Sequence, residues 1–222
     1  MNLLTAGDSF TYGDELTDLQ SAWPYLLGKK INADVVNIGK PASSNDKIFR
    51  MVFEYLITFN NPKPDLVIIG WTSPGRIEFA DDIGYYDVWP GYSGNLFIKD
   101  GCTWRQELAD YISTYHNSEY FHKKFLQQVI MMQTFLTSKG IKYIMLNTVQ
   151  NEYYKQHPIK IPDGSEYFSE VDTTQFLGFN KEGMIEWVEG CKKGPNGHFL
   201  EDGHRIVADR IYEHIRHLGW LS

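Results

Sequence analysis

A serine stands in a glycine-rich turn directly after the first apolar run of the chain. Gly7, Asp8 and Ser9 follow residues 3–6, and Gly13 comes four positions later. A hydroxyl at such a place lies at the mouth of a sheet, where a helix start can lend backbone N–H donors to a developing anion. The placement is typical of a nucleophile, although it equally suits a serine that caps a helix.

Two histidines near the C-terminus are candidates for the general base that a serine nucleophile requires. His198 and His204 lie six residues apart in the sequence. The other five histidines show no metal-ligand spacing with acids, and the two cysteines lie 89 residues apart without a CxxC pair. We therefore predict no metal site and no cofactor, so the side chains themselves must supply the chemistry.

Short β-rich runs alternate with longer segments of helical period along the chain. Strands are predicted at about 3–6, 34–38, 65–70 and 142–147. Helices are predicted at about 22–31, 45–60 with Asn45 as N-cap, 104–139 with a break near Asn117, and 200–217. This alternation indicates a doubly wound α/β domain, in which functional groups lie on loops that leave the carboxyl ends of parallel strands.

A single domain with two insertions accounts for all 222 residues. The first insertion, at about 71–103, is rich in glycine, proline and aromatic residues, and the second spans about 149–195. Neither shows a sustained period, so both are predicted to be loops. No internal repeat or low-complexity linker divides the chain.

Four segments in a fixed order give the chain a family resemblance. GDSFTYG follows the first strand, NIGKPASSN the second and IIGWTSP the third, and GHFLEDGHRIVADRI leads into the last helix. Together they resemble the SGNH hydrolases, or GDSL esterases, and the GWTSP form is associated with a divergent phage and marine bacterial branch. The resemblance implies a flavodoxin-like three-layer α/β/α sandwich with a central parallel sheet. It also implies ester hydrolysis by a serine without the G-x-S-x-G elbow.

The resemblance implies a role for each residue that matches the family pattern. Ser9 is the implied nucleophile, and the N–H groups of Ser9 and Ala42 with the hydroxyl of Thr72 are the implied oxyanion donors. Ala42 stands where the family has glycine, so its N–H is expected to serve only if its φ is negative. Thr72 stands where the family has asparagine, and its hydroxyl is shorter than an amide.

The register of the last segment favours His198 as the base, because the glycine and alanine that follow it match the family spacing. His204 is then a residue of the last helix and is the alternative base. Asn196 occupies the place of the family's aspartate and can orient the imidazole without offsetting its charge. Glu201, Asp202 or a backbone carbonyl could orient the ring instead, and all of these remain open.

Aromatic residues of the first insertion indicate a sugar ligand. Rings such as Trp71 and Trp89 can stack on sugar faces, and Arg76 can neutralise an acidic group. With Asp8, these are the predicted substrate-binding residues. Each ring could equally pin the loop to the sheet, and Arg76 could equally form a surface ion pair. The predicted activity is hydrolysis of small acyl esters, most of all O-acetyl groups on a carbohydrate.

The departures at Ala42, Thr72 and Asn196 support another hypothesis, a non-catalytic glycan-binding or assembly module descended from an esterase. A flavodoxin-like phosphate- or flavin-binding protein is a third hypothesis. A formal net charge of -7 disfavours nucleic acid and anionic membranes as partners. Without an apolar run suited to a membrane helix or signal peptide, we expect a cytoplasmic or virion-associated protein. The sequence indicates no oligomeric state.

Overall fold

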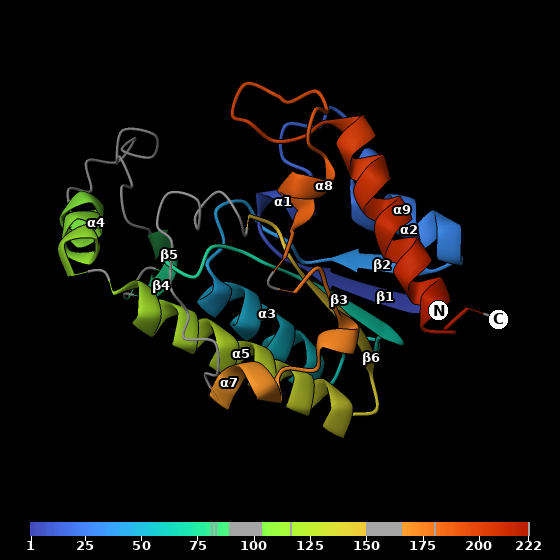
Figure 1. Cartoon of the computed structure of the whole chain (residues 1–222), viewed down its shortest axis with the longest axis horizontal. Coiled ribbons are helices and arrows are strands. Elements are labelled where there is room, and N and C mark those ends of the chain that lie inside the picture. The colour runs from blue at the N-terminus through green and yellow to red at the C-terminus, as the bar shows by residue number, and fades with distance from the viewer. Residues whose placement is uncertain are drawn as a thin grey trace.

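A central parallel sheet organises the computed structural model of the chain (Figure 1). Residues 1–80, 82, 84–88, 104–115, 117–149, 166–179 and 181–221 are described. The strands run in the order β2-β1-β3-β6-β7. They are β1 (Asn2–Ala6), β2 (Asp34–Asn37), β3 (Leu66–Trp71), β6 (Lys142–Asn147) and β7 (Phe176–Leu177). The chain winds outward in both directions from β1, which confirms the predicted doubly wound α/β fold.

Helices cover both faces of this sheet and bury its central strands. One face packs against α2 (Trp23–Ile31) and α9 (Glu201–His217), and the other against α3 (Asn45–Ile57) and α5 (Ser118–Ser138) (Figure 1). All six residues of β3 are buried, which explains why this strand is apolar along almost its whole length. The three layers are the α/β/α sandwich that the resemblance implies.

The helix boundaries follow the predicted ones closely except at α3, which ends at Ile57, before the predicted end at about residue 60, and has a different N-cap. Its N-cap is Ser44, whose Oγ accepts a hydrogen bond from the N–H of Lys47. The side chain of Asn45 instead exchanges two hydrogen bonds with the backbone of Thr72, at 2.9 and 3.0 Å. The predicted break at Asn117 is confirmed, because its side chain caps α5 after α4 (Trp104–Tyr115) ends.

Both predicted loop insertions contain regular structure. The first holds an antiparallel pair, β4 (Ile77–Ala80) and β5 (Tyr85–Val88). The second holds β7, α7 (Glu166–Glu170), η3 (Thr173–Gln175) and α8 (Met184–Trp187). Elements of two to five residues are too short to show a period in the sequence, so the loop prediction was too coarse. In the described parts of the chain, no helix is both long and apolar enough to cross a membrane.

Candidate active site

Ser9 lies at the carboxyl end of β1, beside the point where the strand order reverses. It is the first residue of the short helix α1 (Ser9–Tyr12) and is 6% exposed. The cap of this helix is Asp8, whose Oδ1 accepts a hydrogen bond from the N–H of Phe10. Gly13, at φ +92°, ends the helix. The serine therefore does not cap the helix, and its hydroxyl is available for another partner.

That partner is His198, which comes from the opposite end of the chain. His198 Nε2 lies 2.8 Å from Ser9 Oγ, although the two residues are 189 positions apart. The centroid of the Phe10 ring lies 4.9 Å from that of the imidazole and 5.1 Å from that of Phe199, on which Phe10 stacks. This packing fixes the plane of the imidazole. The distance is the one expected between a serine hydroxyl and its general base.

The second nitrogen of the imidazole faces Glu15. His198 Nδ1 lies 2.9 Å from Glu15 Oε2, and the same carboxylate accepts the backbone N–H groups of Asn196 and His198 at 2.8 and 3.0 Å. Glu15 has φ +67°, a left-handed conformation that is uncommon for a residue with a side chain. Strain of this kind concentrates at functional sites. We call Ser9, His198 and Glu15 the Ser9 triad.

The Glu15 side chain is held in its charged form by the groups that surround it. Burial acts to raise the pKa of this carboxyl, and the side chain is only 8% exposed. The hydrogen bonds from Asn196 N–H, His198 N–H and the His198 ring outweigh burial, so the pKa lies below its usual value. A charged Glu15 can both fix the tautomer of the imidazole and offset its charge after it accepts a proton.

Asn196 does not orient the imidazole with its side chain, which corrects the role expected from the family pattern. It contributes its backbone N–H to Glu15, and the carboxylate itself takes the position beside Nδ1. A tight turn makes this possible, because Gly197 has φ +88° and the N–H of Gly197 donates to the carbonyl of Gly194. A Cβ at Gly194 would lie 2.6 Å from Glu15 Cδ, so only glycine lets the turn wrap around the acid.

Glu15 is the site residue that sequence reasoning missed. The alternatives considered, Glu201 and Asp202, lie in the first turn of α9, where Asp202 pairs with Arg205 at 2.9 Å. The acid comes instead from the segment just after the nucleophile, 183 positions before the histidine. The one available signal was an acidic pair, Asp14 and Glu15, immediately after GDSFTYG.

His204, the alternative base, is enclosed inside the protein. It is 1% exposed, and its Nδ1 accepts a hydrogen bond from the N–H of Trp23 at 3.2 Å. Burial, and then repulsion from His198, lowers the pKa of His204 to about 3. A neutral ring that is bonded to α2 and packed against Phe199 at 4.6 Å has a packing role.

The loop after β2 presents Ala42 in a left-handed conformation, at φ +62°. The negative φ that was expected for a useful N–H is therefore absent. The expectation that the Ala42 N–H requires a negative φ was wrong. A left-handed backbone at this position explains why the family has glycine there. Within the described residues, the N–H groups of Ser9 and Ala42 have no hydrogen-bond acceptor, so both are available to an oxyanion.

The hydroxyl of Thr72 donates its hydrogen bond to a buried carboxylate and not to an oxyanion. Its Oγ donates to Asp8 Oδ2 at 2.7 Å, and the hydroxyl of Thr148 donates to the same oxygen at 2.9 Å. Because its proton is directed at Asp8, the Thr72 hydroxyl does not fit the role of oxyanion donor. Asp8 is 0% exposed, so the expectation that it contacts substrate is also not met.

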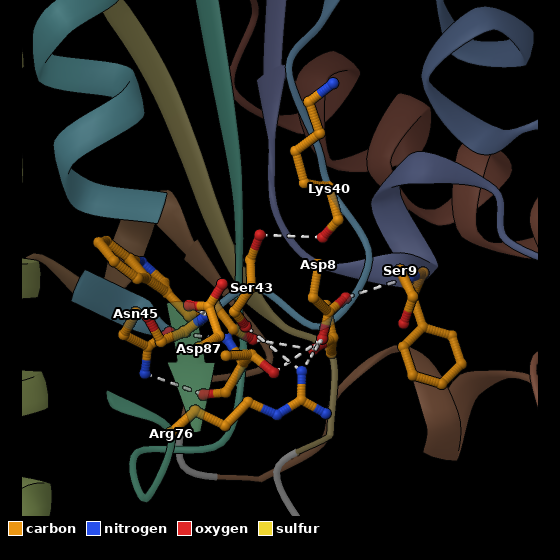
Figure 2. Close-up of polar contacts among 12 residues, drawn as sticks. Asp8, Ser9, Lys40, Ser43, Asn45, Arg76 and Asp87 are labelled. Carbon is orange, nitrogen blue, oxygen red and sulfur yellow. Dashed lines mark hydrogen bonds and ion pairs between the residues drawn. The ribbon is translucent and has the colours of Figure 1, made fainter. Parts of the chain in front are cut away.

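The side chain of Arg76 reaches toward Asp8 in the loop after β1 and Ser43 in the loop after β2 (Figure 2). Its Nη1 is 3.7 Å from Asp8 Oδ2 and donates to the carbonyl of Ser43 at 3.3 Å. The guanidinium offsets the charge of Asp8 and donates to Ser43, so these contacts engage it within the protein. We call Asp8, Thr72, Thr148 and Arg76 the Asp8 network.

Of the two tryptophans predicted to bind sugar, only Trp71 lies within the described residues. Trp71 is 0% exposed and packs edge-on against Phe125 of α5, which makes it a core residue. Its ring therefore offers no stacking surface. Trp89 lies outside the described residues.

A family model matches nearly the whole chain. The model described as a family of unknown function, DUF6071, matches residues 12–222, beginning three positions after Ser9. A search of the curated proteins finds no match.

Solved structures share the fold at low sequence identity. The chain resembles TesA with a TM-score of 0.57 and 16% identity, over 98% of this chain and 99% of that one. It resembles the esterase EstA from Pseudoalteromonas sp. with a TM-score of 0.55 and 11% identity, over 98% and 97%. A family two carbohydrate esterase from Clostridium thermocellum, in complex with cellohexaose, gives 0.54 and 14%, over 99% of this chain and 65% of that one. These likenesses show that the chain shares the fold of these proteins, while the phage and marine branch stays a prediction.

Proposed function

The chain belongs to the DUF6071 family, and we propose that it is a serine ester hydrolase that acts through the Ser9 triad. The observation that carries the proposal is the order of contacts across one imidazole. Nε2 lies 2.8 Å from the Ser9 hydroxyl and Nδ1 lies 2.9 Å from the Glu15 carboxylate. A serine hydroxyl, an imidazole and a carboxylate in contact in this order form the catalytic triad, which activates serine in enzymes of unrelated folds.

The proposed mechanism is acyl transfer through a covalent intermediate. His198 Nε2 takes the proton of Ser9 as Oγ attacks the ester carbonyl, and the N–H groups of Ser9 and Ala42 stabilise the oxyanion. The protonated imidazole, stabilised by Glu15, then gives its proton to the leaving alcohol. Water, activated by the same imidazole, attacks the acyl-enzyme and releases the acid.

The proposed substrates are small acyl esters, with O-acetyl groups on a carbohydrate as the first choice. The likeness to a carbohydrate esterase supports a sugar alcohol. The predicted aromatic platform gives less support, because Trp71 is buried in the core. The substrate class therefore rests on the comparisons more than on the rings.

A non-catalytic glycan-binding module is the second candidate. It is favoured by the loss of the family's third oxyanion donor, since the hydroxyl of Thr72 is bonded to Asp8. One similar structure, at a TM-score of 0.56 and 15% identity, belongs to a carbohydrate esterase whose active site is described as having divergent catalytic and non-catalytic binding functions. Such a module would bind sugar without acyl turnover.

Labelling with a fluorophosphonate, followed by peptide mass spectrometry, tests the proposal. We expect one adduct on Ser9, no adduct in Ser9→Ala, and loss of p-nitrophenyl acetate hydrolysis in both Ser9→Ala and His198→Ala. Ser169→Ala is a matched control, because the hydroxyl of Ser169 is bonded within α7 to the carbonyl of Glu166. Labelling or hydrolysis that persists in Ser9→Ala would falsify the assignment. Binding of cello-oligosaccharides with no turnover of any acetyl ester would favour the second candidate.

A further inference from the structure

A second carboxylate lies beside the catalytic imidazole, on the opposite side from Glu15. Asp14 Oδ2 is 4.0 Å from His198 Nε2, the same nitrogen that faces Ser9 Oγ at 2.8 Å. The Asp14 side chain is 38% exposed, whereas the Glu15 side chain is 8% exposed. The Ser9 triad gives Asp14 no role, yet Asp14 borders the atom that exchanges the proton.

The backbone holds Asp14 in this position. Its N–H donates to the carbonyl of Ser9 at 3.0 Å, and its Oδ1 accepts the N–H of Glu15 at 3.2 Å. One carboxylate oxygen is thus bonded within the turn, and the other is directed toward the imidazole and solvent. The turn that places Glu15 on Nδ1 therefore also places Asp14 near Nε2.

In the proposed reaction the leaving alcohol must sit at Nε2, because this nitrogen returns the proton to it. A hydroxyl on the neighbouring carbon of that alcohol lies about 2.8 Å from the leaving oxygen, a separation similar to an O–H···O hydrogen bond. A carboxylate oxygen 4.0 Å from Nε2 can accept a hydrogen bond from that hydroxyl while the leaving oxygen remains bonded to Nε2. The geometry fits an alcohol that carries two adjacent oxygens.

We propose that Asp14 is a specificity-determining residue that accepts a hydrogen bond from a hydroxyl vicinal to the ester oxygen. The inference rests on the proposed esterase function and narrows its substrate to monoacylated vicinal diols, such as a sugar ring with a free hydroxyl beside the acyl group. The charge of Asp14 also disfavours leaving groups that carry a carboxylate or phosphate near the ester.

The alternative role for Asp14 is electrostatic stabilisation of the protonated imidazole. That role would change the rates of all esters by the same factor, because every ester passes through the same charged ring. Recognition of a vicinal hydroxyl would change only the esters that carry one. The ratio of two rates therefore separates the two roles.

The test compares 2-hydroxyethyl acetate with propyl acetate, which have the same acyl group and alcohols of similar size. We expect kcat/KM, measured by acetate release, to favour the hydroxylated ester in the wild type, and this ratio to fall about 10- to 100-fold in Asp14→Leu. Asp14→Asn keeps an acceptor oxygen and is expected to retain part of the preference, which covers the case of a leucine variant that does not fold. Asp18→Asn is the matched control, because Asp18 caps η1 (Leu19–Ser21) and asparagine caps equally well.

Two results would overturn the inference about Asp14. Either the wild type shows no preference for the hydroxylated ester, or its preference is unchanged in both Asp14 variants, whether or not the two esters lose rate together. These results differ from failure of the proposed function, in which the wild type hydrolyses neither ester nor p-nitrophenyl acetate, or in which Ser9→Ala retains the activity. A wild type that turns over propyl acetate through Ser9 with an unchanged ratio leaves the esterase proposal intact.

Discussion

Two acids flank Ser9 in the sequence, and their surroundings give them different roles. Asp8 is 0% exposed, and its Oδ2 accepts two threonine hydroxyls from the ends of β3 and β6, with Arg76 at 3.7 Å. Glu15 accepts two backbone N–H groups and faces an imidazole. Asp8 therefore joins three strand ends, whereas Glu15 acts on the ring that moves the proton. The partners, not the residue type, decide which acid serves stability and which serves catalysis.

The largest expected effect is on kcat and comes from replacing Glu15, the acid assigned to catalysis. Glu15→Gln keeps an acceptor for the N–H groups but removes the charge that stabilises the imidazolium, so we expect kcat on p-nitrophenyl acetate to fall about 10⁴-fold. Steady-state kinetics measures it, and Asp202→Asn is the control because Asp202 lies in the first turn of α9, paired with Arg205. A Glu15→Gln rate within tenfold of wild type would show that the acid is only structural.

The converse change should cost stability more than rate. Asp8→Asn keeps an N-cap for α1 but removes the buried charge that accepts the hydroxyls of Thr72 and Thr148, so we expect the free energy of unfolding to fall by about 2 to 4 kcal/mol. Urea denaturation measures this loss, and kcat of the folded variant should stay within about tenfold of wild type. An unchanged midpoint with a large loss of kcat would instead assign Asp8 to the reaction.

Acid is expected to lower the free energy of unfolding through His204, which is buried and hydrogen-bonded to α2. Its pKa is lowered to about 3 in the folded protein, so only the unfolded chain takes up this proton as the pH falls below about 6.5. Above that pH the ring is neutral in both states and contributes no pH dependence. The wild type therefore loses about 1.2 kcal/mol of stability through His204 between pH 6 and 5. We expect this loss to be absent in His204→Asn, as measured by urea denaturation at several pH values. His122, whose pKa burial lowers to about 4, continues to contribute in both proteins.

The smallest expected effect concerns Ala42. It precedes Ser43, whose carbonyl accepts a hydrogen bond from Arg76 of the Asp8 network. Replacing alanine by glycine removes the strain of φ +62° but increases the entropy of the unfolded chain. We expect a gain of about 0.5 kcal/mol in the free energy of unfolding, with kcat within about threefold of wild type, because the N–H is retained. Thermal denaturation checks the gain, and a clear loss of stability would contradict the left-handed geometry.

The sequence predicts the scaffold better than the site because scaffold signals are local. Hydrophobic runs and helical periods predict β3, β6 and the break before α5 to within a residue or two. Register alone also favours His198 over the buried His204. Glu15 is not predictable in this way, because its contact with His198 joins residues 183 positions apart. Thr72 shows the same limit, since only the structure reveals the buried acid that takes its proton.

The contact between Ser9 and His198 also determines when catalysis can begin during synthesis of the polypeptide. Once β6 has been translated, the nascent chain contains the nucleophile and the acid, together with β1, β2, β3 and β6, but not the base. The tight turn around Glu15 and the docking of α9 beside α2 come later and bring the imidazole into place. Nascent chains that lack His198 and α9 are therefore expected to be inactive toward esters, so hydrolysis reports that this segment has docked.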